Sequence, residues 1–371
     1  MTDLAERALL PAGLRDILPP FAAFEADIVS RLMAVFDGHG YERVKPPLIE
    51  FEQSLADEAG AAHGAFRVMD PLTQRMMAVR CDITPQVARI AATRLTHDPR
   101  PLRLAYAGQV LQVKGSQLRA ERQFGQVGVE LIGATDSAAD AEILALCLEV
   151  LGHVGLSGIT VDLTLSTLVP AVIGDLNGDT GLRNALDHRD VGAVSAAGGE
   201  TARLLIALIE AVGPADRALS RLQALDLPPA AQALRSRLVE VVALIRAALP
   251  DLTLTIDPVE TRGFEYHTGV GFTIFAKGCA GEIGRGGRYL AHGEPAVGAT
   301  LFMDTLIDIL PRPEAKKRLY VPAGTARGEA ERFRNSGWVT INGLAVADDV
   351  AAEARRLRCS HVLLGGVLKE I

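Results

Sequence analysis

The run from Pro101 to Gly133 contains two strands joined by a polar loop, and it constrains the fold more than any other stretch. The first strand alternates Leu102, Leu104 and Tyr106. The second alternates Val127, Val129 and Leu131 with Phe124, Gln126, Gly128, Glu130 and Ile132. Because successive side chains of a strand point to opposite faces, one face is apolar and the other presents an amide and a carboxylate. Gly128 lies between those two polar residues, and it predicts an open concavity there.

This polar face has two interpretations that the residues alone leave open. It is suited to binding a small polar ligand through Gln126 and Glu130. It is equally typical of the solvated face of an antiparallel sheet, where polar residues point outward.

Composition and charge exclude several classes of protein. The chain has 371 residues, 49% of them apolar and 22% charged, which is typical of a soluble globular protein of two or three domains. A net charge of −7 argues against a dominant basic surface for nucleic acid. No run of about 18 uninterrupted apolar residues occurs, and the N-terminus lacks a signal-peptide pattern. We therefore expect no membrane role.

The cysteines give a further indication of the compartment. Cys81, Cys147, Cys279 and Cys359 are far apart and match neither a zinc-ligand spacing nor a disulfide framework. We expect a reducing, cytoplasmic location, with no metal and no cofactor.

The local composition and the periodicity of apolar residues change along the chain, and they predict its domain organisation. Strand-rich residues occupy 1–165 and return at 251–315, so these two parts are expected to form one core. Between 166 and 250, Ala, Leu and Arg dominate at helical spacing without a convincing strand, which predicts an inserted helical domain. Residues 316–371 alternate short strands and helices, and they predict a small C-terminal α/β appendage.

Two further segments carry residues of chemical interest. Cys81 to Pro85 is a turn that leads into a helix, so Asp82 and Thr84 are expected at the helix start, either as caps alone or beside a ligand. The glycine-rich run 281–289 fails the spacing of a phosphate loop, although Arg285 and Arg288 could attract an anion. Ala296 to Leu310 is predicted to be a helix.

The order of several segments identifies a resemblance. These are YERVKPPLIE, VRCDITPQVARIAA, PLRLAYAGQV, RQFGQVGVELIG, RGFEYHTGVGF, GRGGRY and PAVGATLFMDTL. Over roughly residues 10–310 they resemble the catalytic core of class II histidyl-tRNA synthetases. The resemblance implies an α+β fold, with an antiparallel sheet flanked by helices, and a dimer formed through a motif that Pro47 marks. It also implies a histidine pocket, for which we predict Asp82, Thr84, Gln112, Gln126, Glu130, Arg262, Tyr266 and His267.

Two departures from the synthetase pattern bear on activity. A synthetase holds the ATP α-phosphate with an arginine in its second motif, where this chain has Gln112. A second phosphate-holding arginine is replaced by Thr305. Adenylate formation depends on fixed cations that stabilise charge on the phosphate, so adenylation and tRNA charging are not expected.

The remaining pattern resembles a family of synthetase paralogues, the regulatory subunits of ATP phosphoribosyltransferase. Asp82 to Arg89 is closer to that family than to the synthetases, whereas His267 replaces a usual second aromatic hydroxyl. The resemblance implies a non-catalytic subunit of L-histidine biosynthesis that activates a short-form catalytic subunit. It also implies that L-histidine acts as an effector. Two alternatives are a degenerate histidyl-tRNA synthetase and another paralogue that binds an amino acid or a different enzyme.

Overall fold

The chain forms two compact units, Met1–Leu310 and Pro311–Ile371. A computed structural model describes residues 9–55, 64–115, 120–174, 180–261, 266–312 and 314–371. In these ranges no helix is both long enough and apolar enough to cross a membrane.

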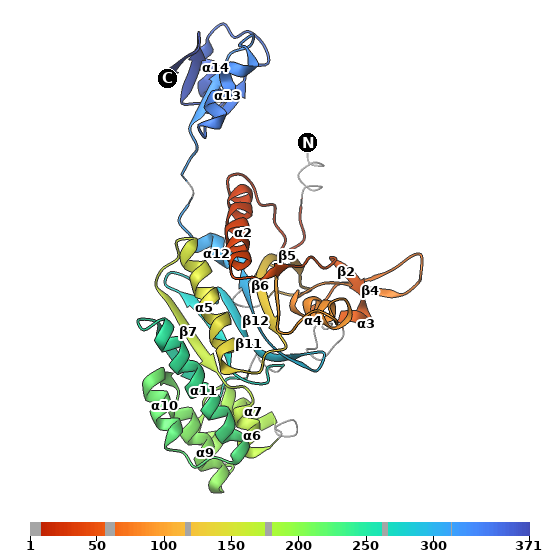
Figure 1. Cartoon of the computed structure of the whole chain (residues 1–371), viewed down its shortest axis with the longest axis vertical. Coiled ribbons are helices and arrows are strands. Elements are labelled where there is room, and N and C mark those ends of the chain that lie inside the picture. The colour runs from red at the N-terminus through yellow and green to blue at the C-terminus, as the bar shows by residue number, and fades with distance from the viewer. Residues whose placement is uncertain (1–8, 56–63, 116–119, 175–179, 262–265, 313) are drawn as a thin grey trace. The chain divides into compact units, whose positions relative to one another are not determined.

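The first unit is built on a large sheet with helices packed beside it (Figure 1). In this sheet the described residues form nine strands in the order β1-β5-β6-β12-β11-β10-β7-β9-β8. Its six central strands are antiparallel neighbours: β5 (Leu102–Leu111), β6 (Gln123–Ile132), β12 (Glu294–Phe302), β11 (Gly284–Ala291), β10 (Gly271–Ala276) and β7 (Ile159–Thr164). At the margins β1 (Glu42–Arg43) and β9 (Thr253–Asp257) pair in parallel with β5 and β7, and β8 (Gly213–Pro214) pairs with β9. The predicted antiparallel sheet is confirmed for its central strands.

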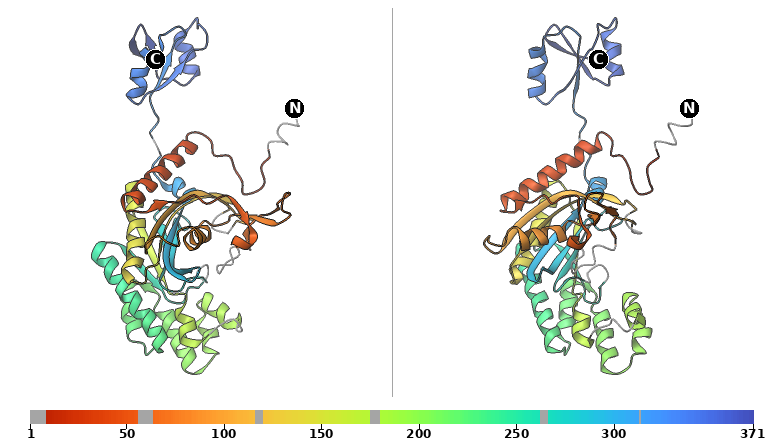
Figure 2. Two further views of the ribbon diagram at one scale, coloured as in Figure 1. Left: turned by 45° about the vertical axis from the view of Figure 1, so that its right-hand side comes forward. Right: turned by 90° about the vertical axis from the view of Figure 1, so that its right-hand side faces the viewer.

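Helices cover both faces of this sheet. α2 (Phe21–Gly38) and α5 (Ser137–His153) pack on the face that carries Val127, Val129 and Leu131. α4 (Thr84–Thr93) packs on the opposite face, around which the sheet curves (Figure 2). The interpretation of a solvated polar face is therefore wrong, because α4 covers that face and Gln126 and Glu130 are buried beneath it.

The predicted helix from Ala296 to Leu310 is wrong over its first half. Residues up to Phe302 belong to β12, and only α12 (Met303–Ile309) is helical. β12 lies between β6 and β11 with both faces buried, so it is apolar on both sides and lacks the alternation that distinguishes a strand in sequence.

Smaller elements surround the main sheet. A separate three-stranded sheet, in the order β2-β4-β3, joins β2 (Ile49–Phe51), β4 (Met76–Val79) and β3 (Arg67–Met69), with α3 (Glu52–Leu55) beside it. β3 and β4 pair as an antiparallel hairpin.

The described residues between β7 and β9 form six helices. They are α6 (Leu168–Ile173), α7 (Thr180–Asp187), α8 (Val191–Ser195), α9 (Gly199–Glu210), α10 (Ala215–Gln223) and α11 (Pro229–Ala248). α11 packs against α5, where Arg237 donates to the buried Asp140 at 2.6 Å. The same carboxylate accepts from Arg288 of β11 at 2.9 Å, so one buried acid joins α5, α11 and the sheet. The division of this unit into a core and an inserted domain stays a prediction.

The second unit is a four-stranded sheet with two helices. Its order is β14 (Val339–Asn342), β13 (Arg318–Val321), β15 (His361–Leu364) and β16 (Val367–Glu370), with α13 (Arg327–Asn335) and α14 (Val350–Arg356). The alternation predicted for this segment is confirmed up to β15. The final strand was not predicted, and it pairs with β15 through a turn in which Gly365 and Gly366 both have positive φ.

Candidate functional site

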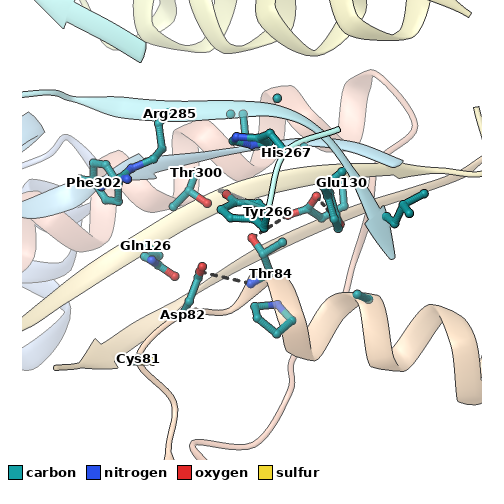
Figure 3. Close-up of a pocket in the computed structure, with 18 of the residues that line it drawn as sticks. Cys81, Asp82, Thr84, Gln126, Glu130, Tyr266, His267, Arg285, Thr300 and Phe302 are labelled. Carbon is teal, nitrogen blue, oxygen red and sulfur yellow. Dashed lines mark hydrogen bonds between the residues drawn. The ribbon is translucent and has the colours of Figure 1, made fainter. Parts of the chain in front are cut away.

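A cavity of about 330 Å³ lies between the sheet and the start of α4. All seven predicted site residues that the structure describes line it: Asp82, Thr84, Gln112, Gln126, Glu130, Tyr266 and His267. The eighth, Arg262, lies outside the described residues. The volume falls within the range of small-molecule sites, about 300–1,000 Å³. Segments far apart in sequence thus meet at one hollow, and Figure 3 shows their side chains around it.

Glu130 is the most deeply buried acid of this cavity, with 1% of its surface exposed. Its Oε1 accepts from the Thr84 hydroxyl at 2.9 Å and from the Tyr106 hydroxyl at 3.4 Å. Its Oε2 accepts from the Tyr289 hydroxyl at 2.9 Å. Burial raises the pKa of this carboxyl from 4.5 to about 8, because the hydroxyl hydrogen bonds offset only part of the cost of desolvating the charge.

The space above Gly128 is filled, which corrects the expected open concavity. Tyr106 is the β5 partner of Gly128, and a Cβ at Gly128 would overlap the Tyr106 ring and the carbonyl of Ala299. Tyr106 in turn makes a 2.7 Å hydrogen bond with Thr300. Glycine is therefore needed here to admit a neighbouring side chain that supports Glu130.

The start of α4 presents polar groups to the same cavity. Asp82 Oδ1 accepts from the backbone N–H of Thr84, the first residue of α4, at 3.3 Å, whereas the N-cap position itself is Ile83 and has no side-chain capping bond. Gln126 Oε1 accepts from the backbone N–H of Ile83 at 3.1 Å, which joins β6 to this turn. These bonds fix one carboxylate and one amide beside the cavity (Figure 3).

Tyr266 and His267 form another wall. Their rings lie 4.2 Å apart between centroids, and Tyr266 also contacts the edge of Tyr289. Burial, with the nearby charge of Arg285, lowers the pKa of His267 to about 3. His267 is consequently neutral near pH 7, and it adds no positive charge to the wall.

The two arginines of the glycine-rich run have different surroundings. Arg285 lines the cavity, whereas Arg288 is buried against Asp140. Residues three apart on a strand point to opposite faces, so both could not serve one anion. The expectation that the pair attracts an anion is wrong for Arg288.

Gln112 lies at the cavity edge beside the β5–β6 loop. Its backbone N–H donates to the carbonyl of Arg122 at 2.7 Å, and the Arg122 guanidinium donates back to the Gln112 carbonyl at 3.2 Å. The side chain facing the cavity at this position is a neutral amide. In the part of the chain that the structure describes, no group of three His, Cys, Asp or Glu residues could hold a metal ion.

Sequence analysis missed three side chains of this site, Tyr106, Tyr289 and Thr300, and it named Arg285 only as a possible anion ligand. Tyr106 was assigned to the apolar face of its strand, and only the cross-strand register shows that its hydroxyl reaches Glu130. Strand parity gives a signal for Arg285, because Arg285 and Gly287 share the face opposite to Arg288.

Comparisons with known proteins identify the family of this chain. A profile of the histidyl-tRNA synthetase family matches residues 13–306. The ATP phosphoribosyltransferase regulatory subunit of Paramagnetospirillum magneticum is 61% identical over 370 residues, which cover 98% of each chain. The protein of the same description from Gluconobacter oxydans is 43% identical and covers 100% of this chain and 99% of its own.

This chain belongs to the ATP phosphoribosyltransferase regulatory subunit family. Solved structures support the shared fold. One from Bacillus halodurans, described as an ATP phosphoribosyltransferase regulatory subunit/histidyl-tRNA synthetase, gives a TM-score of 0.81 at 23% identity, covering 94% of this chain and 96% of its own. The histidyl-tRNA synthetase of Nostoc sp. PCC 7120 gives 0.78 at 18% identity, covering 98% and 96%. The regulatory subunit family thus shares the class II synthetase-like architecture predicted from sequence.

Proposed function

We propose that this chain activates a short-form ATP phosphoribosyltransferase catalytic subunit and transmits feedback inhibition by L-histidine. Its membership of the regulatory subunit family supports the partnership. In this proposal the partner joins ATP to phosphoribosyl pyrophosphate, and this chain forms no bond itself. The two subunits would assemble as a hetero-oligomer in the cytoplasm.

The observation that carries the effector role is the Glu130 carboxyl, which three hydroxyls hold at the inner end of the cavity. An imidazole N–H is a suitable donor to such a group. The ammonium group of the same ligand would lie near Asp82 and Gln126 at the α4 start. A hydrogen bond involving a charged group contributes about 1.5–3 kcal/mol, so these contacts can select histidine among small amino acids.

Loss of adenylation follows in this proposal from the neutral residues at the two phosphate positions. Gln112 faces the cavity as an amide, and Thr305 lies on α12. Removing one group that stabilises transition-state charge typically costs about 2.7–4 kcal/mol in the activation barrier. The alternative of a degenerate synthetase would have to compensate for two such losses.

The test is to measure inhibition of the assembled transferase by histidine with Glu130→Gln in the regulatory chain. This substitution keeps the shape of the side chain and removes its charge. Above pH 8, where the Glu130 carboxyl is ionised, we expect the inhibitory concentration of histidine to rise about tenfold to a hundredfold, because one charge-assisted contact is lost. Binding and inhibition are linked, so calorimetry on the complex should show a matching loss of affinity.

Glu149→Gln is the matched control, because Glu149 is an exposed acid on α5 that pairs with His39. It should leave inhibition unchanged. If histidine inhibits the complex that contains Glu130→Gln as strongly as it inhibits the wild-type complex, histidine acts elsewhere and the proposal fails.

A further inference from the structure

The cavity has a positively charged end opposite Glu130. Among its described lining residues Arg285 is the only arginine or lysine, and the acids beside the cavity are Asp82 and Glu130. Figure 3 shows the Arg285 side chain at one end of the cavity and Glu130 at the other. The cavity is therefore lined both by carboxyl groups that can accept hydrogen bonds and by a guanidinium that is always positively charged.

The guanidinium is held in place from two sides. Glu282 Oε1 accepts from Arg285 Nη2 at 2.6 Å, and the guanidinium carbon lies 5.6 Å from the centre of the Phe302 ring. A guanidinium has five N–H donors, and this ion pair uses one of them. The side chain is thus oriented while retaining donors for a second acceptor.

The sheet register fixes the separation of the two ends. Thr300 lies opposite Gly128 and Arg285 lies opposite Thr300, so Arg285 is two strands across and two residues along from Glu130. With the usual rise and strand spacing, their Cα atoms are about 12 Å apart. Both side chains line the same cavity, and Figure 3 shows the guanidinium beside Phe302.

We infer that Arg285 binds the carboxylate of the amino-acid effector, so that the site requires a free α-carboxylate. This inference rests on the proposed function, because it assumes that the imidazole contacts Glu130 in the same cavity. An arginine fork matches the two oxygens of a carboxylate, and it offers no comparable partner to an alcohol. The site accordingly discriminates free histidine from analogues in which the carboxylate is reduced, amidated or absent.

The test compares L-histidine with L-histidinol, in which an alcohol replaces the carboxylate, by calorimetry on the assembled complex. Wild type should bind histidine about tenfold to a hundredfold more tightly than histidinol. Arg285→Gln should weaken the binding of histidine by the same factor and leave the binding of histidinol nearly unchanged. The ratio of the two affinities should then be close to one. Arg285→Lys, which keeps the charge without the fork, should recover part of the preference.

The control is Arg94→Gln, an equal change of net charge at an exposed residue that follows α4. It should preserve the wild-type ratio. The inference is overturned if Arg285→Gln still binds histidine much more tightly than histidinol, even if Glu130→Gln weakens the binding of both ligands. If Glu130→Gln weakens neither ligand, the proposed function has failed first, and the two failures are distinguishable.

Discussion

Replacing Glu130 with glutamine should change how the stability of the chain depends on pH. The carboxyl is almost fully buried, and burial raises its pKa from 4.5 to about 8. Between these two values the folded chain therefore binds more protons than the unfolded chain. The free energy of unfolding contributed by this group must fall as pH rises through that window, and it is constant below it.

The magnitude follows from the two pKa values. Each pH unit inside the window is worth about 1.4 kcal/mol, so the wild type should lose up to about 3 kcal/mol between pH 5 and pH 8 through this group. Glutamine does not titrate. It can still accept from Thr84, and the Tyr289 hydroxyl can rotate to accept from the new amide. The variant should therefore gain stability relative to wild type as pH rises, by up to about 3 kcal/mol at pH 8.

Urea denaturation at several pH values, followed by far-ultraviolet circular dichroism, measures this difference. Tryptophan fluorescence is unsuitable, because the only tryptophan, Trp338, lies in the C-terminal unit. Glu142→Gln is the control, because the pKa of Glu142 is shifted in the opposite direction and its effect on the pH dependence of stability should have the opposite sign. Burial acts to raise the pKa of Glu142, but hydrogen bonds from Arg103 and Tyr41 outweigh it and lower the pKa.

Glu142 consequently stabilises the fold above its unfolded pKa, and this contribution is lost as pH falls through its lower folded pKa. Glu142→Gln should be less stable than wild type at pH 7, with a difference that shrinks toward acid pH. The reasoning for Glu130 is refuted if the curves of Glu130→Gln and wild type are parallel from pH 5 to pH 8.

Three further outcomes are expected. Histidine-dependent pyrophosphate exchange by the purified chain should equal a control without protein, because Gln112 and Thr305 replace the phosphate-binding arginines; clear turnover would support the synthetase alternative. Light scattering should show a dimer or larger particle, because the resemblance to the synthetases implies a subunit contact through the motif that Pro47 marks; a 39.4 kDa particle alone would contradict this. Gly128→Ala should displace Tyr106 and so lower the free energy of unfolding by about 1–3 kcal/mol. Gly152 is a helical glycine with open space around it, so Gly152→Ala should be neutral or stabilising by up to about 1 kcal/mol. Equal effects of the two substitutions would refute the packing argument.

Local patterns predicted much of the site. The two-residue period of β6 is enough to put Gln126 and Glu130 on one face, and the turn before Pro85 is enough to put Asp82 and Thr84 at a helix start. Each of these features depends on a few consecutive residues. The order of such segments along the chain also identified the family.

Other features depend on which distant segments become neighbours. Tyr106 fills the space at Gly128 only because β5 pairs with β6 in one register, and a slip of one residue would turn that ring to the other face. Burial of Glu130, and with it the raised pKa, requires α4 to cover the sheet. Likewise β12 was taken for a helix because strands on both sides and buried faces remove its alternation.

The sequence by itself therefore determined which residues share a strand face or begin a helix, since backbone geometry repeats every two or about 3.6 residues. Tertiary structure decided which side chains close the cavity, which of the two arginines reaches it, and how strongly its central carboxyl holds a proton. Those properties arise from register, packing and desolvation among segments more than a hundred residues apart, such as Glu130 and Tyr289, and no local pattern records them.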